Sequence, residues 1–164
     1  MKTLYLIRHG KSSWDNLSVE DYERPLLPKG IRRTKKVASF LKENSISPQL
    51  IVSSHAVRAF ETACIIAEKL KYPLEKIQVE EDMYFSGAEA MENIIYSVDD
   101  RHEQLMLVGH NPDMTNFANH FLFEKIDYLP TSGVVAIEFD TTLWNEIMSC
   151  PREIKFVITP KTLK

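Results

Sequence analysis

Short apolar runs alternate with longer amphipathic segments along this chain, and this alternation limits the possible folds more than any other feature. The apolar runs have the length and the residue types of buried strands. The segments between them repeat apolar residues every three or four positions, as helices with one buried face do. Strands are expected at residues 3–8, 49–53, 77–80, 105–108, 134–140 and 154–159, and helices at 28–43, 56–71, 88–98 and 113–123, with a short helical piece near 143–147.

Strands that alternate with helices favour a parallel sheet covered on both faces. The predicted fold class is therefore α/β, as a three-layer α/β/α sandwich with a mostly parallel sheet of about six strands. Only a short connection separates the last two expected strands, which predicts an antiparallel edge there. The chain has 164 residues, a length that is most simply one domain spanning residues 1–164.

Composition narrows the classes of function. The formal net charge of −3 gives no reason to expect binding to nucleic acid or to an anionic membrane. The two cysteines, Cys64 and Cys150, lie far apart and form no zinc-binding spacing, which fits a reduced cytoplasmic compartment. No stretch resembles a signal peptide or approaches the length of a membrane span. Nothing in the sequence speaks against a monomer.

Three expected parallel strands are followed by residues that suit anion chemistry. The first ends in Arg8-His9-Gly10, the second leads to Arg58, and the fourth ends in Gly109-His110. If these strands are parallel neighbours, their polar side chains meet at one edge of the sheet, where open α/β folds bind ligands. Two guanidiniums and two imidazoles repel one another unless an anion lies between them, and phosphate matches the donors of arginine.

A neutral histidine beside a phosphorus atom can act as a nucleophile. The arginines and the second imidazole would then hold the phosphate oxygens while their charge shifts. No cofactor is expected, and no metal is implied, because the sequence shows no clustered set of carboxylates that would bind Mg²⁺.

These motifs resemble those of the histidine phosphatase superfamily. The resemblance rests on Arg8–Gly10, on the pattern S-x-x-x-R-A-x-x-T-A from Ser54 to Ala63, and on Gly109-His110. The small size, Arg8–Trp14, Arg24–Leu26 with Gly30, and Gly109–Pro112 point within it to the branch of SixA-like phosphohistidine phosphatases. The resemblance implies that His9 is phosphorylated in catalysis and that Arg8, Arg58 and His110 form the phosphate pocket.

The chain departs from the mutases of the superfamily at two positions. Lys11 stands where those enzymes usually carry Glu, and Asp15 stands where they carry a phosphate-binding Asn, so that role is not transferred to Asp15. Lys11 and Ser12 are candidate donors to phosphate or to an acidic region of the substrate. The basic cluster of the helix expected at 28–43 is interpreted as a solvated face, with a binding role as the alternative; it comprises Lys29, Arg32, Arg33, Lys35 and Lys36.

The proton donor is the least defined part of the site. Asp82 lies nearest the position of the acid in larger relatives, and Glu81 is next, but both also fit solvated loop carboxylates. The SixA-like branch generally lacks this acid. An imidazole leaving group can depart with its own proton, whereas an alkoxide needs one supplied, so a weak acid position favours a phosphoramidate substrate.

The sequence thus predicts a metal-independent phosphatase that removes phosphate from phosphohistidine in a protein. One alternative is a small-molecule phosphomonoesterase with the same mechanism, whose partner is a small phosphate ester. The other is a non-catalytic regulator that binds phosphate.

Overall fold

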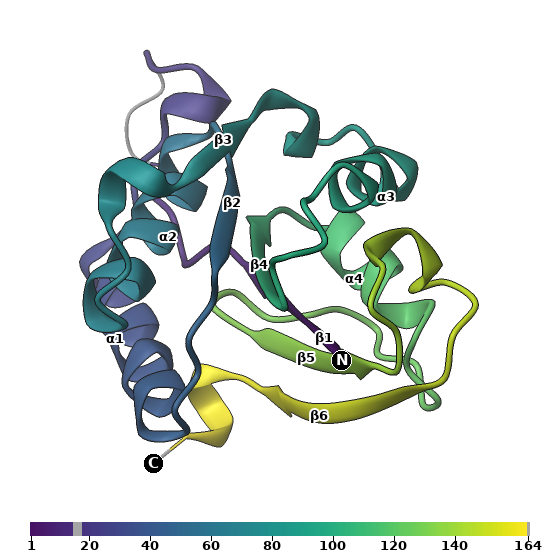
Figure 1. Cartoon of the computed structure of the whole chain (residues 1–164). Helices are drawn as coiled ribbons and strands as arrows, with labels where there is room; N and C mark the ends of the chain where they lie inside the picture. Colours follow the sequence, from purple (N-terminus) through teal and green to yellow (C-terminus); the bar gives the residue numbers. More distant parts are fainter. Residues whose placement is uncertain (15–17, 164) are drawn as a thin grey trace.

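A computed structural model describes residues 1–14 and 18–163 of the chain; Asp15, discussed above, lies outside the described residues. Six strands form one sheet in the order β3-β2-β4-β1-β5-β6 (Figure 1). Their bounds are Lys2–Arg8 for β1, Leu50–Ser54 for β2, Gln78–Glu80 for β3, Gln104–Gly109 for β4, Val134–Phe139 for β5 and Arg152–Ile158 for β6.

The pairing of the strands confirms the predicted α/β fold. Strand β4 lies between β1 and β2 and is parallel to both, and β3 runs parallel to β2 on the outside. On the other side, β5 is antiparallel to β1 and β6 is antiparallel to β5, which confirms the antiparallel edge. The carboxyl ends of β1, β2 and β4 therefore lie at one edge of the sheet.

Helices cover both faces of the sheet, as Figure 1 shows. Helices α1 (Pro28–Glu43) and α2 (Val57–Lys69) lie on one face, and α3 (Ala88–Tyr96) and α4 (Asp113–Asn119) on the other. A hydrophobic core lies on each face of the sheet, and successive residues of β1 point alternately into the two cores. Tyr5 and Ile7 pack with α1 and α2, and Leu4 and Leu6 pack with α3 and α4. This alternation follows from the pleat of a strand that is buried on both faces.

Most element boundaries match the expected ones, and α1 matches at both ends. Helix α4 is shorter than expected because Asn119 ends it. The side chain of Asn119 donates to the carbonyl of Ile126 at 2.9 Å and accepts from its amide at 3.0 Å, which turns the chain away from the helix. The segment expected as a loop at 81–87 begins with a 3-10 turn, Glu81–Met83.

The long polar stretch before α1 is held against the rest of the molecule. Ser12 and Leu26 form an isolated antiparallel bridge, and a 3-10 turn spans Asp21–Glu23. Gly30 lies so close to Lys11 that a Cβ at that glycine would stand 2.2 Å from the carbonyl oxygen of Lys11. The first turn of α1 therefore fixes the segment that leaves β1.

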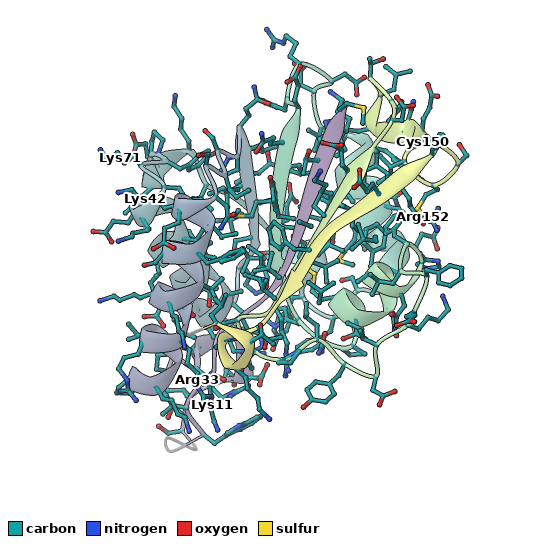
Figure 2. All side chains as sticks on the ribbon, turned by 90° about the horizontal axis from the view of Figure 1, so that it is seen from below. Lys11, Arg33, Lys42, Lys71, Cys150 and Arg152 are labelled. Atoms are coloured by element: carbon teal, nitrogen blue, oxygen red, sulfur yellow. The ribbon has the colours of Figure 1, made fainter. Side chains whose placement is uncertain are left out.

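Figure 2 places the cationic residues of α1 relative to the rest of the chain. Lys11 and Arg33 are labelled at one end of α1 and Lys42 at the other, whereas Cys150 lies across the sheet.

The cysteines Cys64 and Cys150 are free. Within the described part of the chain, no helix has both the length and the apolar character that a membrane crossing needs.

Candidate active site

The residues that follow β1 and β4 bring two histidines together. Arg8 pairs with Gly109 in the register of these strands, and the amide of His9 donates to the carbonyl of Gly109 at 3.0 Å. The rings of His9 and His110 consequently lie with their centroids 5.1 Å apart. Parallel strands thus produce the convergence of imidazoles that the sequence predicted.

Two arginines complete this cluster from neighbouring elements. Arg58 stands in the first turn of α2, just after β2, is 1% exposed, and directs its Nε toward Nε2 of His9 at 3.4 Å. Arg8 donates from Nη1 to the carbonyl of Leu129 at 3.1 Å, while its buried Nε has no partner among the described residues. Arg8, His9 and Arg58 line one cleft of about 560 Å³.

The environment of His9 keeps its imidazole neutral and orients it. Burial lowers the pKa of His9 to about 4, and the positive charges of Arg58 and Arg8 act in the same direction. Nδ1 of His9 lies 2.7 Å from the carbonyl oxygen of Gly10, which can only accept a hydrogen bond. Nδ1 therefore carries the proton, and the lone pair of the neutral ring is on Nε2, the atom nearest Arg58.

His110 is held by β2 and covered by an aromatic side chain. Its Nε2 lies 2.8 Å from Oγ of Ser54, and its buried Nδ1 has no partner in the described part of the structure. Burial lowers the pKa of His110 to about 3, so this ring is neutral as well. Phe85 packs on it at a centroid distance of 4.8 Å and forms the cleft wall there. The φ of Phe85 is 57°, a left-handed conformation that is rare for a bulky residue.

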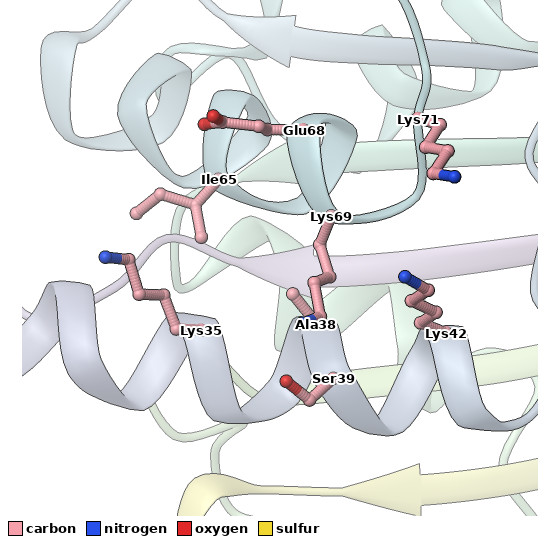
Figure 3. A pocket seen from close by; sticks show the side chains of 8 residues that line it. All are labelled: Lys35, Ala38, Ser39, Lys42, Ile65, Glu68, Lys69 and Lys71. Carbon is pink, nitrogen blue, oxygen red and sulfur yellow. The ribbon is translucent and has the colours of Figure 1, made fainter.

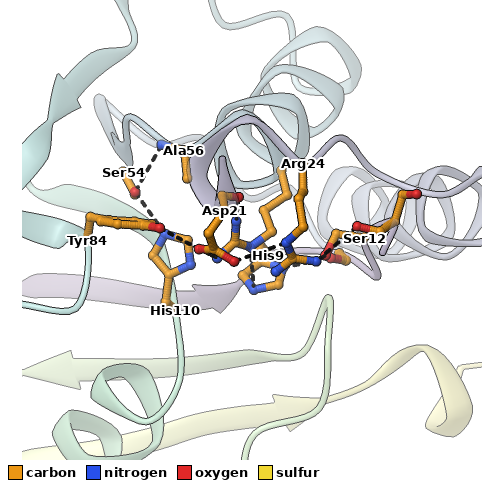
Figure 4. A network of polar contacts seen from close by, with 11 residues as sticks. His9, Ser12, Asp21, Arg24, Ser54, Ala56, Tyr84 and His110 are labelled. Carbon is orange, nitrogen blue, oxygen red and sulfur yellow. Dashed lines mark hydrogen bonds and ion pairs between the residues drawn. The ribbon is translucent and has the colours of Figure 1, made fainter. Parts of the chain in front are cut away.

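A carboxylate that sequence reasoning did not single out lies among these cations. Oδ2 of Asp21 accepts from Nη2 of Arg58 at 3.0 Å and from the hydroxyl of Tyr84, and Oδ1 accepts from Nε of Arg24 at 3.0 Å (Figure 4). Although burial opposes it, the hydrogen bonds from Tyr84 and Arg58 lower the pKa of Asp21 to about 2. Asp21 thus supplies an anion from the chain itself. Its one signal in the sequence is its spacing of three residues from Arg24.

Arg24 is a further cation of the cleft, held by the segment that follows His9. It donates from Nη1 to Oγ of Ser12 at 2.7 Å and to the carbonyl of Ser13 at 3.1 Å. Its guanidinium lies 3.4 Å from the centre of the Trp14 ring, close enough for a cation–π contact. Ser12, expected as a donor to phosphate, lines the cleft and accepts from Arg24, while Lys11 lines the same cleft with an exposed side chain.

The two acidic candidates lie apart from this arrangement. Asp82 and Glu81 are exposed in the 3-10 turn after β3, and neither lines the cleft. A role for Asp82 as proton donor therefore stays a prediction. Within the residues that the structure describes, no group of three or more His, Cys, Asp or Glu side chains is placed to hold a metal ion.

A second hollow of about 390 Å³ lies between α1 and α2 (Figure 3). Lys35, Lys42, Lys69 and Lys71 surround it together with Glu68. These groups can attract an anion, but lysine ammoniums offer no nucleophile while they are charged, and no imidazole lines this hollow. The cleft at His9 is therefore the candidate active site.

Comparisons with known proteins identify the family of this chain. The family model of the histidine phosphatase superfamily (branch 1) matches residues 4–105. An uncharacterised chloroplastic protein of Arabidopsis thaliana is 36% identical over 154 residues, which covers 88% of this chain and 70% of that protein. A 2,3-bisphosphoglycerate-dependent phosphoglycerate mutase of Nautilia profundicola is 39% identical over 72 residues, 43% of this chain and 31% of the mutase.

Solved structures show the same fold. The putative phosphohistidine phosphatase SixA of Agrobacterium tumefaciens aligns with a TM-score of 0.80 and 23% identity, covering 97% of this chain and 99% of that one. The protein histidine phosphatase SixA in complex with tungstate aligns with a TM-score of 0.83 and 18% identity, covering 99% of each chain.

Proposed function

The chain belongs to the histidine phosphatase superfamily, and on this premise we propose that it is a metal-independent phosphatase that uses His9 as nucleophile on phosphohistidine in a protein. The neutral imidazole of His9 supports this role, because its lone pair is on Nε2, where only a long 3.4 Å contact from Nε of Arg58 reaches it, while Nδ1 is held by Gly10. A nucleophile of this kind divides a difficult displacement into two easier ones.

In the first step, Nε2 of His9 forms a bond to the phosphorus, and the bond from phosphorus to the substrate imidazole breaks. The substrate ring is protonated by solvent on its other nitrogen before this step, so it takes the electron pair of the broken P–N bond and leaves as neutral imidazole. In the second step, the oxygen of a water molecule attacks the phosphorus of phospho-His9. The P–Nε2 bond breaks, orthophosphate forms, and the protons of the water pass to the phosphate and to solvent.

The hydrogen-bond donors around His9 are assigned to the phosphoryl oxygens. Arg58 lies 3.4 Å from the attacking atom, and Arg8 has a buried Nε that no described residue satisfies. His110 offers Nδ1, which is likewise unpaired in the described structure. Buried donors without partners are uncommon in folded proteins and are typical of binding sites. Lys11 and Ser12 line the same cleft as Arg8 and Arg58, whereas His110 packs against Phe85 of the cleft wall and does not itself line the cleft.

The observation that carries the choice of substrate is the state of Asp21. Among the described residues, Asp21 is the one carboxylate that lines the cleft, and its pKa of about 2 keeps it ionised at neutral pH. It therefore cannot donate a proton to an alkoxide leaving group. An imidazole leaving group needs no such donor, which favours a phosphoramidate over an alkyl ester.

The experiment is a chase of radiolabelled phosphate from a phosphohistidine protein. Wild type should release orthophosphate in the presence of EDTA, and a reaction stopped with alkali should leave a label on His9 that is stable in alkali and lost in acid. His9→Ala should show neither. Wild-type release by His9→Ala, or loss of activity with EDTA, would contradict the mechanism. Tight binding of the phosphoprotein without any release would instead identify a regulator.

A panel of leaving groups separates the two classes of substrate. Turnover of phosphohistidine peptides should exceed that of alkyl phosphates, and Asp82→Asn should change the rate with peptides by less than about twofold, since Asp82 lies outside the cleft lining. If Asp82→Asn slows alkyl phosphates far more than aryl phosphates, Asp82 is a proton donor and the small-molecule assignment is favoured.

A further inference from the structure

The cleft at His9 continues beyond the proposed phosphate pocket toward the start of α1. Its outer wall includes Lys11 and Arg33. The backbone of Lys11 packs on Gly30, and Arg33 follows Gly30 by three residues, so that both lie on the same side of the helix. Figure 2 shows Lys11 and Arg33 at this end of the molecule. We call the wall formed by these two side chains the Lys11–Arg33 site.

The Lys11–Arg33 site is a concentration of positive charge that the chain does not neutralise. Arg24 and Arg58, deeper in the cleft, both donate to the carboxylate of Asp21. Neither the side chain of Lys11 nor that of Arg33 forms an ion pair or a hydrogen bond with any residue that the structure describes. The chain as a whole carries more acidic than basic residues, with 23 Asp and Glu against 20 Lys and Arg. The excess of cations in this cleft is thus a local feature of a chain that is acidic overall.

Burial separates Arg33 from the other basic residues of α1. The cluster was interpreted from the sequence as a solvated face, and Arg32, Lys35 and Lys36 are indeed exposed. Arg33 is half-buried and faces the cleft, so that interpretation is wrong for this residue. Because a helix turns by about 100° per residue, neighbouring arginines of α1 point in different directions.

An exposed aromatic side chain borders the same part of the cleft. Trp14 is 70% exposed, although its ring also covers the guanidinium of Arg24. A large apolar ring that remains open beside an arginine is typical of surfaces that bind another protein, where Trp and Arg contribute much of the binding energy. A small phosphate ester would leave most of this ring in water, whereas a peptide can cover it.

We propose that the Lys11–Arg33 site binds an acidic side chain of the phosphoprotein substrate, one that lies close to its phosphohistidine. This inference rests on the proposed function and adds a specificity to it: the two cations select substrates whose phosphorylated segment carries Glu or Asp. An acidic side chain neutralises the local excess of charge, and the flat ring of Trp14 packs on the peptide beside it. The interaction is one between partly exposed charges, so its contribution to binding is modest and depends on salt.

The test compares two phosphohistidine peptides of identical length, one with Glu and one with Gln beside the phosphohistidine. Wild type should hydrolyse the Glu peptide with a kcat/KM about fivefold higher, chiefly through KM, because each exposed ion pair contributes little. Arg33→Gln and Lys11→Gln should each reduce this preference to about twofold or less. Raising the salt concentration from about 50 mM to about 500 mM should reduce the wild-type preference in the same way.

Arg32→Gln is the matched control. It removes the same charge from the adjacent position of α1, but Arg32 is exposed and does not line the cleft. This variant should keep the wild-type preference for the Glu peptide. Turnover of the Gln peptide by Arg33→Gln and by Arg32→Gln reports that the fold and the phosphate pocket are intact. Lys11→Gln is judged by its preference between the two peptides alone, because Lys11 lines the cleft beside His9.

The outcomes separate this inference from the proposed function. Equal kcat/KM for the two peptides with wild type, while both are hydrolysed, overturns the acidic specificity and leaves the phosphohistidine phosphatase standing. Equal losses of preference in Arg33→Gln and Arg32→Gln overturn the location of the site. Hydrolysis of neither peptide overturns the proposed function, and the inference with it.

Discussion

The guanidinium of Arg58 donates from Nη2 to Oδ2 of Asp21 at 3.0 Å, and the backbone carbonyl of Asp21 accepts from Nη1 of the same arginine at 2.8 Å. The residue beside the proposed nucleophile is therefore oriented by a carboxylate that lies 37 positions earlier in the chain. Charge-assisted hydrogen bonds of this kind fix direction as well as position. The orientation of Nε of Arg58 toward His9 depends on the ion pair between Arg58 and Asp21.

Asp21→Asn should lower kcat/KM about tenfold, the loss expected when one charge-assisted hydrogen bond no longer holds a catalytic group in place. Asp140→Asn is the matched control, since it is an exposed aspartate at the far end of β5 and should leave the rate unchanged. Steady-state kinetics with a phosphohistidine peptide measures both. A rise in kcat/KM for Asp21→Asn would mean that the carboxylate competes with the phosphoryl group for Arg58.

The imidazole of His9 should remain neutral until the pH falls to about 4, because burial and the neighbouring arginines oppose its protonation. Between pH 6.5, the ordinary pKa, and about 4, the unfolded state binds protons at His9 and His110 that the folded state does not bind. The free energy of unfolding should therefore decrease as the pH falls through this range.

Nitrogen NMR of the labelled histidines measures the titration directly, and chemical denaturation at several pH values measures the stability. Protonation of His9 near pH 6.5 would contradict the buried, electropositive environment. In the presence of bound phosphate the titration should move upward, since an anion stabilises the imidazolium.

Ser54→Ala should reduce activity about threefold to tenfold, because it removes the hydroxyl that holds Nε2 of His110 at 2.8 Å. It should also lower the free energy of unfolding by about 1 kcal/mol, the usual contribution of one buried hydrogen bond. Ser53→Ala is the control from the same strand: its hydroxyl donates to the carbonyl of Ser54 and does not contact His110. If both variants lose similar stability and only Ser54→Ala loses activity, the hydroxyl of Ser54 has the proposed role. Equal activities of Ser53→Ala and Ser54→Ala would contradict that role.

Gly30→Ala should destabilise the protein by about 1–3 kcal/mol, the range for an overpacked contact. In an unobstructed helix the same change stabilises by about 1 kcal/mol, so the sign of the effect is diagnostic. The cause is the carbonyl oxygen of Lys11, which lies 2.2 Å from the position of the added Cβ. Thermal denaturation measures the effect. An increase in melting temperature would show that the segment after β1 moves away from α1 without cost, which would contradict the prediction.

The sequence indicated the fold well because its signals are local. The branched apolar runs and the helical stripes are each contained within one element, and a strand buried on both faces, such as Leu4–Ile7, reads as a continuous apolar run. The sequence was sufficient to predict the convergence of His9, Arg58 and His110, because the carboxyl ends of parallel strands lie at one edge of a sheet. Their convergence in the structure agrees with that reasoning.

The partners of Arg24 and the place of Arg33 could not be obtained in this way. Arg24 and Asp21 belong to a segment with little regular structure, whose path depends on the Ser12–Leu26 bridge and on the packing of Lys11 against Gly30. The periodicities of helices and strands relate residues within one element, so they cannot predict contacts of this kind between separate segments. The lowered pKa of His9 is of the same kind, because it arises from burial among groups contributed by several elements.

The amino-acid sequence by itself determined the order of strands and helices and the chemistry available at the carboxyl edge of the sheet, since hydrophobic periodicity and side-chain type are properties of short segments. The tertiary structure alone decided which charges face one another. Electrostatic interactions depend on distances between residues that are remote in sequence, and those distances exist only once the core has formed.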